Sequence, residues 1–385
     1  MNKEVIYLDH AAATPVDRKV LAAMQPFLSD AFYNPSAPYA PAIEVRKAYE
    51  RAKQTIASTF GASADDIVMT AGATESINLA FHSISGHVVV TSIEHHAVLE
   101  AAKRHEHTVV EVDGKGMVDP EVVRRAIRDD TELVSVALAN NEIGTVQPLR
   151  AIAEVVKTER EKRLQQGSDV PIYLHTDASQ GVGQLDVHVS RLGVDLMTLN
   201  AAKIYGPKQV GLLWAAHSVS LQPQINGGGQ ERGLRSGTEN VAGVIGFAKA
   251  IELAAEHRVH EAERLRKLRD DMQVKLLEAF PEAVVSGHPK HRLASYLHIS
   301  FPSVDAERVL FILESSGVLV ATGSACAANK GTRSHVLEAI GLEPSVADGS
   351  LRITLGHLSD ETTCRKAVEL IIEAVRREYS RTGVL

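Results

Sequence analysis

The chain has 385 residues, of which 44% are hydrophobic and 23% charged, a composition ordinary for a soluble globular protein long enough for two domains. Its net charge of −7 offers no basic surface, so we expect neither nucleic acid nor a membrane as a partner. Its two cysteines, Cys326 and Cys364, exclude a disulfide framework and a four-cysteine metal site, and they suit a reducing compartment. The first residues lack the apolar core of a signal peptide and no apolar run is long enough to span a membrane, so we predict a cytoplasmic protein.

Helical and strand-like runs alternate between about residues 40 and 220, which predicts an α/β fold with a mostly parallel sheet. The strands are expected at Ile67–Thr70, Val88–Ile93, Leu133–Leu138, Ile172–His175, Asp195–Leu199 and Val210–Trp214. Two of the helices between them have clear signals at one end. Asp119 and Pro120 start a helix at Glu121–Arg128, and Gly167 closes one at Ala151–Gln166.

A long and perhaps kinked helix over Thr238–Phe280 then leads into a second, α+β part. Its strands are expected near Tyr296–Phe301, Val318–Ala321 and Leu351–Leu355, and its helices near Ala306–Ser315 and Asp360–Ser380. We therefore predict a large domain over residues 14–255 and a small domain made of residues 1–13 and 256–385.

Four polar residues fall just after predicted strands of the large domain. His95, Asn141, Asp177 and Lys203 each follow the carboxyl end of a different strand. Ligands of open α/β sheets bind at that edge, so we expect these side chains to share one site.

Lys203 is flanked by small and apolar residues, which would desolvate its amine, lower its pKa and let it react with a carbonyl group. A surface lysine is an equally good interpretation of this segment alone, and Lys208 is the weaker candidate. Asp177 could pair with a protonated ring nitrogen of a cofactor, although a helix cap explains a lone aspartate as well.

Two glycine-containing segments suit anion binding. Residues 72–76, which begin with Gly72, Ala73 and Thr74, lie between a strand and a helix, where free backbone amides can hold a phosphate. Residues 227–238 combine glycines with Arg232 and Arg235. A plain helix cap and a surface loop are the respective alternatives.

Cysteine and histidine positions complete the set of candidates. Cys326 lies among small residues, which suits either a mobile nucleophile or a packing residue, whereas Cys364 lies inside the last predicted helix and suits packing. His95 and His96 are adjacent and would point to opposite faces of a strand, so we expect no metal site there.

The chain resembles the cysteine desulfurases of the NifS/IscS type, within the class V aminotransferase-like enzymes of fold type I. The resemblance covers nearly the whole chain, and several motifs in family order carry it. They are Tyr7–Pro15, Gly72–Ser76, Glu94–His96, Asn140–Gly144, Asp177–Gln180, Lys203–Lys208, Glu231–Asn240 and Gly323–Cys326.

This resemblance implies a homodimer that uses pyridoxal 5′-phosphate. Lys203 would bind the cofactor covalently, Asp177 would pair with its ring nitrogen, and His95 would stack on the ring and assist proton transfer. The resemblance implies further cofactor contacts from Gly72, Ala73, Thr74, Asn141, Gln180 and Asn200, and from Thr238 toward the neighbouring subunit's phosphate. It implies substrate contacts from Asn34, Asn141 and the carboxylate-binding Arg352.

The implied reaction converts L-cysteine to L-alanine and leaves the sulfur on Cys326 as a persulfide. An acceptor protein would then take the sulfur for iron–sulfur clusters or thiolated nucleotides. A selenocysteine lyase, another class V transaminase, and a non-catalytic homologue that binds partners are the alternatives.

Three segments depart from the family pattern. Asn200 and Ala202 stand where the family has a serine and a histidine that contact the phosphate, which puts cofactor affinity in doubt. Residues 36–41 differ from the usual Ser-x-His-x-x-Gly, and Ala294–Ser295 replaces the frequent Pro-Asn. By comparison with the family, we also expect the tail by which some members dock a scaffold to be absent after the last predicted helix.

Overall fold

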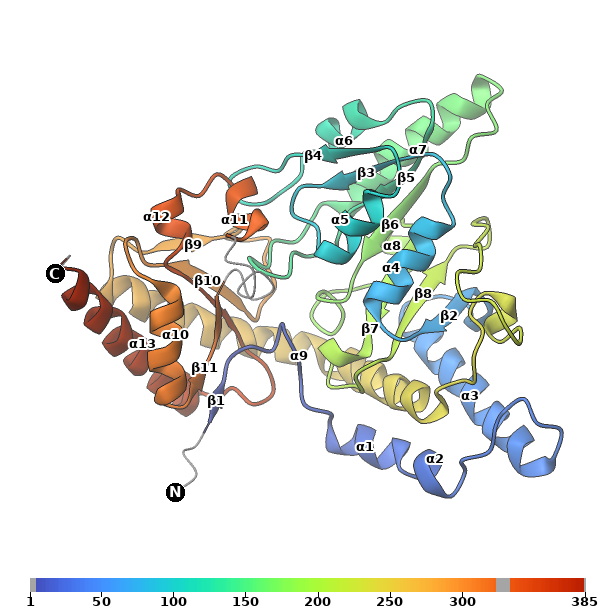
Figure 1. Ribbon diagram of the computed structural model, residues 1–385, viewed down its shortest axis with the longest axis horizontal. Helices are drawn as coiled ribbons and strands as arrows, with labels where there is room; N and C mark the ends of the chain where they lie inside the picture. The colour runs from blue at the N-terminus through green and yellow to red at the C-terminus, as the bar shows by residue number, and fades with distance from the viewer. Residues whose placement is uncertain (1–4, 323–332, 384–385) are drawn as a thin grey trace.

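Figure 1 shows a computed structural model of the chain, which describes residues 5–322 and 333–383. The molecule has two parts that lie side by side and are joined by one long helix, α9 (Val241–Ala279). Among the helices of these residues, none combines the length and the apolar character needed to cross a membrane.

A seven-stranded sheet forms the larger part. Its strands, in spatial order, are β2 (Ile67–Thr70), β8 (Gly211–Ala215), β7 (Leu196–Asn200), β6 (Tyr173–Asp177), β5 (Thr131–Ser135), β3 (His87–Thr91) and β4 (His107–Val110). Every pair is parallel except the two that β8 makes, which are antiparallel. The prediction of a mostly parallel sheet is confirmed, and each of the six expected strands overlaps an observed one.

The edge strand β4 was not predicted. Only Val110 of its four residues is buried, so the apolar signal of a strand is weak there. The order of the sheet also places β8 between β2 and β7, which no local pattern indicated.

Helices cover both faces of the sheet, and the strands between them are therefore almost continuously apolar. In β3, Val88 and Val90 pack toward the core that includes α4 (Ala73–His82) and α5 (His96–Ala102). Val89 faces the opposite core, to which α3, α6, α7, α8 and the first turns of α9 contribute. Those helices span Ala40–Thr59 (α3), Pro120–Ala126 (α6), Leu149–Gln165 (α7) and Val189–Leu192 (α8).

The smaller part has its own apolar core around a four-stranded antiparallel sheet. The sheet order is β12 (Ala321–Thr322), β13 (Ser350–Thr354), β10 (Tyr296–Ser300) and β9 (Val284–Ser286). Helices α10 (Ala306–Ser315) and α13 (Glu361–Thr382) pack on it, and α11 (His335–Ala339) and α12 (Pro344–Ala347) lie nearer the large sheet in Figure 1.

The amino-terminal segment belongs to this smaller part. Its strand β1 (Ile6–Tyr7) pairs in parallel with β11 (Val318–Leu319) before the chain crosses to α1 (Arg18–Met24) and α2 (Pro26–Ser29). Three single 3₁₀ turns, η1 (Ala64–Asp66), η2 (Ala201–Lys203) and η3 (Glu231–Gly233), complete the elements.

Helix α9 is continuous over 39 residues, without the kink that the sequence left open. Its residues up to Ile251 pack in the larger core, and those from Ala262 onward pack in the smaller one. The helix therefore connects two separate cores, and the predicted division at residue 255 falls between the two sets.

Candidate functional site

A cavity of about 370 Å³ lies at the carboxyl edge of the large sheet, and we call it the site cavity. It is lined by residues that follow β2, β3, β5, β6 and β7, by two alanines of the amino-terminal segment, and by two side chains of the smaller part. The lining includes Ala11, Ala12, Ala73, Thr74, His95, Asn141, Asp177, Gln180, Asn200, Lys203, His335 and Arg352. The structure thus brings His95, Asn141, Asp177 and Lys203 together around one cavity.

Lys203 lies in η2, within the connection that turns the chain from β7 back into the antiparallel β8. It is half-buried, and its Nζ donates hydrogen bonds to the backbone oxygens of Ala11 at 2.7 Å and Ala12 at 2.8 Å. Lys208, by contrast, is exposed and donates to the backbone oxygen of Thr14. Lys203 therefore lines the cavity and Lys208 does not, which agrees with the sequence analysis, where Lys208 was the weaker candidate.

Asp177 is the last residue of β6, and its Oδ1 accepts a hydrogen bond from the backbone N–H of Ser179 at 2.9 Å. One carboxylate oxygen therefore caps a turn rather than the helix of the alternative interpretation, because no helix follows Asp177 in the described residues before α8. Within residues 5–322 and 333–383, the other oxygen, Oδ2, has no hydrogen-bond donor, and the side chain borders the cavity.

His95 caps the amino terminus of α5. Its Nδ1 accepts the backbone N–H of Ala97 at 3.0 Å, so in the neutral ring the proton is on Nε2. Burial lowers the pKa of His95, and the nearby Asp177 opposes that shift. A neutral imidazole with a protonated Nε2 at a cavity wall is able to stack on a flat ring and to exchange a proton.

The amino terminus of α4 forms one end of the cavity, where Ala73 and Thr74 line it. Gly72 precedes the helix with φ of 136°, which favours glycine. A Cβ on Gly211 of β8 would lie 2.6 Å from the Cα of Gly72, so only glycine allows the turn to pass this strand. Free amides and a threonine hydroxyl therefore meet at this end, a combination that suits a phosphate.

The two positions that depart from the family pattern lie beside this phosphate-suited end. The Oδ1 of Asn200 accepts the backbone N–H of Ala202 at 3.1 Å, which leaves the amide N–H₂ of Asn200 as the donor group at the cavity. Ala202 supplies no side-chain donor, and its backbone oxygen accepts from the hydroxyl of Thr14.

Asn140 and Asn141 have different tasks in the turn after β5. The side chain of Asn140 holds the turn, because its Oδ1 accepts from the backbone N–H groups of Glu142 and Ile143. Asn141 borders the cavity, and its backbone oxygen accepts from Nη1 of Arg352 at 3.0 Å. Glu142 is buried, which raises its pKa to about 7, and the hydroxyl of Ser334 donates to it.

Arg352 of β13 brings a buried guanidinium to the cavity from the smaller part. Its Nη2 pairs with Oδ1 of Asp9 at 2.8 Å. This pair holds the planar group in one orientation, in which it is able to bind a carboxylate.

Within the described residues, three expected site residues do not line this cavity, namely Asn34, Thr238 and Gly72, which directly precedes the lining residue Ala73. Asn34 is exposed, and its Oδ1 accepts the backbone N–H of Ser36. Thr238 is exposed beside a different pocket, together with Tyr49 and Glu231. Cys326 lies outside the described residues.

The segment before Thr238 is held in place by a buried ion pair. Glu231 accepts from Nζ of Lys53 at 3.0 Å and from the hydroxyl of Tyr49 at 2.5 Å, and both charged side chains are almost fully buried. This pair explains how Glu231 keeps a left-handed backbone, with φ of 49°.

Sequence reasoning missed four residues at or behind the cavity walls, namely Asp9, Glu94, Tyr296 and His335. Asp9 and Glu94 fall in motifs that carried the resemblance, so a signal was present for them. The Nε2 of His335 bonds the backbone oxygen of Glu94 at 2.9 Å across the two parts, a contact without a local signal.

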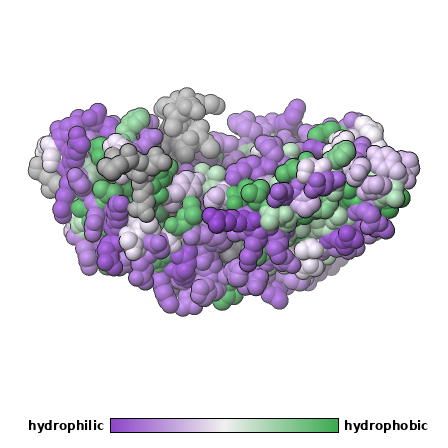
Figure 2. All heavy atoms as spheres, turned by 90° about the horizontal axis from the view of Figure 1, so that it is seen from below, coloured by the Kyte–Doolittle hydropathy of each residue, from purple (hydrophilic) through white to green (hydrophobic). Residues whose placement is uncertain are grey.

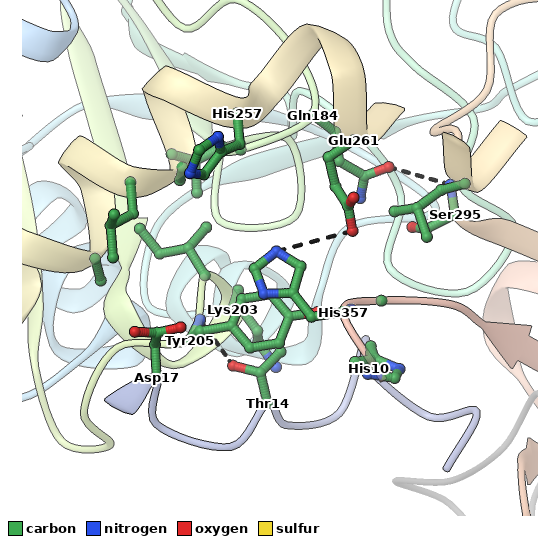
Figure 3. Close-up of a pocket in the computed structure, with 18 of the residues that line it drawn as sticks. His10, Thr14, Asp17, Gln184, Lys203, Tyr205, His257, Glu261, Ser295 and His357 are labelled. Atoms are coloured by element: carbon green, nitrogen blue, oxygen red, sulfur yellow. Dashed lines mark hydrogen bonds and ion pairs between the residues drawn. The ribbon is translucent and has the colours of Figure 1, made fainter. Parts of the chain in front are cut away.

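A second pocket, of about 140 Å³, shares Ala11, Gln180 and Lys203 with the site cavity (Figure 3), and we call it the joint pocket. It lies where the amino-terminal segment, α9 and the smaller part meet. There the ring of Tyr205 stacks on His357, with centroids 3.7 Å apart, and Nε2 of His357 faces Oε1 of Glu261 at 3.8 Å. Among the described residues, no group of three or more histidine, cysteine or acidic side chains is arranged to hold a metal ion.

Comparisons with known proteins agree with this geometry. A model of the family "Aminotransferase class-V" matches residues 6–363. The cysteine desulfurase IscS of Dictyoglomus turgidum is 40% identical over 97% of this chain and 96% of its own length, and IscS 1 of Archaeoglobus fulgidus is 39% identical over 96% and 97%.

Solved structures are similar as well. A NifS-like protein superposes with a TM-score of 0.89 at 32% identity, covering 97% of this chain and all of its own. SspA, solved in complex with cysteine, has a TM-score of 0.76 at 34% identity, covering 91% of this chain and 98% of its own.

Proposed function

The chain belongs to the class-V aminotransferase family, and we propose that it is a pyridoxal-phosphate-dependent cysteine desulfurase that converts L-cysteine to L-alanine. The observation that carries this proposal is the convergence of Lys203, Asp177 and the amino terminus of α4 in one cavity, with Arg352 opposite. Lys203 suits the aldehyde of the cofactor, Asp177 its ring nitrogen and the amino terminus of α4 its phosphate. Arg352 suits the carboxylate of the substrate.

The donor set of the cavity fits pyridoxal phosphate. Asp177 presents an unbonded carboxylate oxygen for a ring N–H, within the part of the chain that the structure describes. Gln180, Asn141 and Asn200 bring amide groups, and the amides of α4 with Thr74 suit the phosphate. The absence of a histidine at Ala202 removes one phosphate contact, which should weaken cofactor binding by about 1.5–3 kcal/mol relative to relatives that have it.

When bound, the cofactor supplies an electron-withdrawing ring that stabilises negative charge on the substrate. Lys203 then holds or moves a proton at Nζ near the substrate's Cα, and His95 is able to exchange a proton at Nε2. Arg352, fixed by Asp9, orients the substrate through its carboxylate. Asp177 would accept a hydrogen bond from the ring N–H through Oδ2, the carboxylate oxygen that has no donor among the described residues.

We propose that the thiolate of Cys326 attacks the sulfur of the substrate. The bond between Cβ and sulfur breaks, a sulfur–sulfur bond forms on Cys326, and protonation of the remaining carbon gives alanine. The persulfide would then pass to an acceptor protein of iron–sulfur cluster assembly or nucleotide thiolation. Such thiol chemistry requires a reducing compartment, which supports a cytoplasmic location.

We also propose a homodimer. Four large apolar side chains within about twenty residues of α1 to α3 are more than half exposed, namely Leu21, Leu28, Phe32 and Tyr39. Figure 2 shows apolar side chains in patches among hydrophilic ones on the lower face of the molecule. Thr238 and Asn34 lie away from this chain's cavity, so a second copy would be needed for either one to complete a site.

The test is the absorbance spectrum of the protein with pyridoxal phosphate, followed by addition of cysteine and a reducing thiol. We expect a visible band that shifts with cysteine, and formation of sulfide and alanine in equal amounts. Cys326→Ala should abolish sulfide formation while keeping the band. Cys364→Ala is the matched control, because the Cys364 thiol is buried and its pKa is raised to about 11 by that burial.

Two outcomes would contradict the proposal. Alanine formation that survives in Cys326→Ala would favour a transaminase or a related lyase. The absence of a band at any cofactor concentration would favour a non-catalytic homologue, the alternative to which Ala202 points.

A further inference from the structure

Tyr296 is a fully buried tyrosine that joins the smaller part to the site cavity. It is the first residue of β10, pairs with Thr354 of β13, and is 1% exposed. It directly follows Ala294–Ser295, one of the segments that depart from the family pattern. The site residues derived above do not include it.

The hydroxyl of Tyr296 contacts the side chain of Gln180, which lines the cavity. The distance from the hydroxyl oxygen to Oε1 of Gln180 is 2.7 Å, and Nε2 of Gln180 donates to the backbone oxygen of Ala11 at 3.1 Å. Ala11 offers only an acceptor at that point, so the amide nitrogen must face Ala11 and the amide oxygen must face Tyr296. The phenol therefore donates, and the amide of Gln180 is held in one of its two orientations.

This orientation has a consequence at the cavity. The amide nitrogen of Gln180 has two N–H groups, and one of them is used by Ala11. The other remains for a group inside the cavity. If the amide of Gln180 were flipped, its oxygen would face the cavity as an acceptor. The same oxygen would also lie next to the backbone oxygen of Ala11, and two acceptors cannot form a hydrogen bond.

The ring of Tyr296 also supports the turn that carries Asn141. A Cβ on Gly144 would lie 2.6 Å from the Cβ of Tyr296, so the ring packs directly on the glycine. Gly144 has φ of 72° and closes the turn by donating its N–H to the backbone oxygen of Asn140 at 3.1 Å. One side chain of the smaller part thus fixes two loops of the larger part that border the cavity.

We infer that Tyr296 is a positioning residue, which holds Gln180 so that its amide presents an N–H donor to the cofactor's ring oxygen. This inference rests on the proposed function, because pyridoxal phosphate is the occupant that requires the donor. A donor at that oxygen stabilises its negative charge, so losing the donor should raise the pH at which the bound cofactor's visible band titrates.

The experiment compares Tyr296→Phe, which removes only the hydroxyl, with the wild-type protein. We expect the dissociation constant of pyridoxal phosphate to rise about 3–10-fold. We also expect the pH midpoint of the visible band to rise by about half a unit or more. Tyr379→Phe is the matched control, since it alters a buried tyrosine of α13 in the smaller core and should change neither quantity.

A double-mutant cycle tests whether the effect passes through Gln180. If it does, adding Tyr296→Phe to Gln180→Leu should change the dissociation constant less than about twofold. Additive effects would overturn the inference, because they would mean that Tyr296 acts independently of Gln180. Thermal melting of the cofactor-free variants shows whether a loss of stability accounts for the change.

The two proposals fail in different ways. If wild-type protein gives no visible band with pyridoxal phosphate, the proposed function fails and the inference falls with it. If wild-type protein gives the band, and Tyr296→Phe has the same affinity and pH midpoint, only the inference is wrong.

Discussion

The site cavity and the joint pocket share Lys203, Gln180 and Ala11, and both contain imidazoles and carboxylates. The two pockets differ in whether these side chains have hydrogen-bond partners within the protein. In the joint pocket, Tyr205 accepts the backbone N–H of His357 at 2.7 Å, and Glu261 pairs with Arg264 at 2.7 Å. The Nδ1 of His10 donates to the backbone oxygen of Thr354 at 3.0 Å.

The site cavity leaves polar atoms for a ligand. Over residues 5–322 and 333–383, Oδ2 of Asp177, Nε2 of His95 and the side-chain amide of Asn141 have no hydrogen-bond partner in the protein. Among the buried atoms of the described residues, Nε of Arg352 at the site cavity and Nε2 of His10 at the joint pocket also lack a partner. The two pockets therefore differ in degree, because several unpaired groups surround the site cavity, whereas the other groups named for the joint pocket bind one another.

The largest effect should come from Lys203, one of the three residues that the two pockets share. Lys203→Ala should lower alanine formation by about a thousandfold or more, because under the proposed function it removes the amine that would bind the cofactor and move the substrate proton. Rates of alanine release measure it, with Lys208→Ala as the control, since that exposed lysine should matter less than about threefold. A Lys203→Ala protein that keeps a tenth of the wild-type rate would contradict the assignment.

The contribution of Glu94, which lies behind the site cavity, to the free energy of unfolding should fall as the pH rises. Burial raises the pKa of Glu94 to about 8 from an ordinary value of 4.5, against hydrogen bonds from Ala137 and Thr91. The folded protein therefore holds a proton that the unfolded chain releases above pH 4.5, so this contribution is lost as the pH rises through about 8. Glu94→Gln should flatten the pH dependence of the free energy of unfolding by roughly 3 kcal/mol between pH 5 and 8.

Urea unfolding at several pH values measures this change. Glu132→Gln provides a comparison at a half-buried glutamate, whose carboxylate oxygen accepts a hydrogen bond from the backbone N–H of Ser85. Equal slopes for Glu94→Gln and the wild-type protein would mean that Glu94 is ionised in the fold.

In the joint pocket, the contribution of His357 to the free energy of unfolding should change with pH in the opposite direction, and by less. Burial lowers the pKa of His357, so its share of stability is present above its unfolded pKa of about 6.5 and is lost as the pH falls. His357→Ala should lower the free energy of unfolding by about 1 kcal/mol through loss of the stack on Tyr205. His357→Phe keeps a ring in place and should recover most of that loss.

The same pair of variants separates the two pockets functionally. His357→Phe should also be less sensitive to acid than the wild-type protein, as followed by thermal melting between pH 5 and 7. Cofactor affinity should stay within about twofold in both His357 variants. A large change in affinity would show that the joint pocket belongs to the binding site.

Much of the site could be predicted from the sequence because each of its main residues follows a strand with a clear apolar signal. His95, Asn141, Asp177 and Lys203 come after β3, β5, β6 and β7, and the carboxyl ends of parallel strands meet at one edge. Arg352 and Gln180 were found only through the family resemblance. The Cys326 segment stays a prediction, since it lies outside the described residues.

The sequence by itself determined six of the seven strands of the large sheet, the long helix α9 and the order of the candidate residues, because strand and helix periodicity depends on neighbours within a few positions. Only the tertiary structure decided that Asp9 fixes Arg352 across 343 residues and that Tyr296 fixes Gln180 across 116. It also decided that β8 runs antiparallel between β2 and β7. Such contacts depend on how two separate apolar cores pack around α9, and no local pattern of residues carries that information.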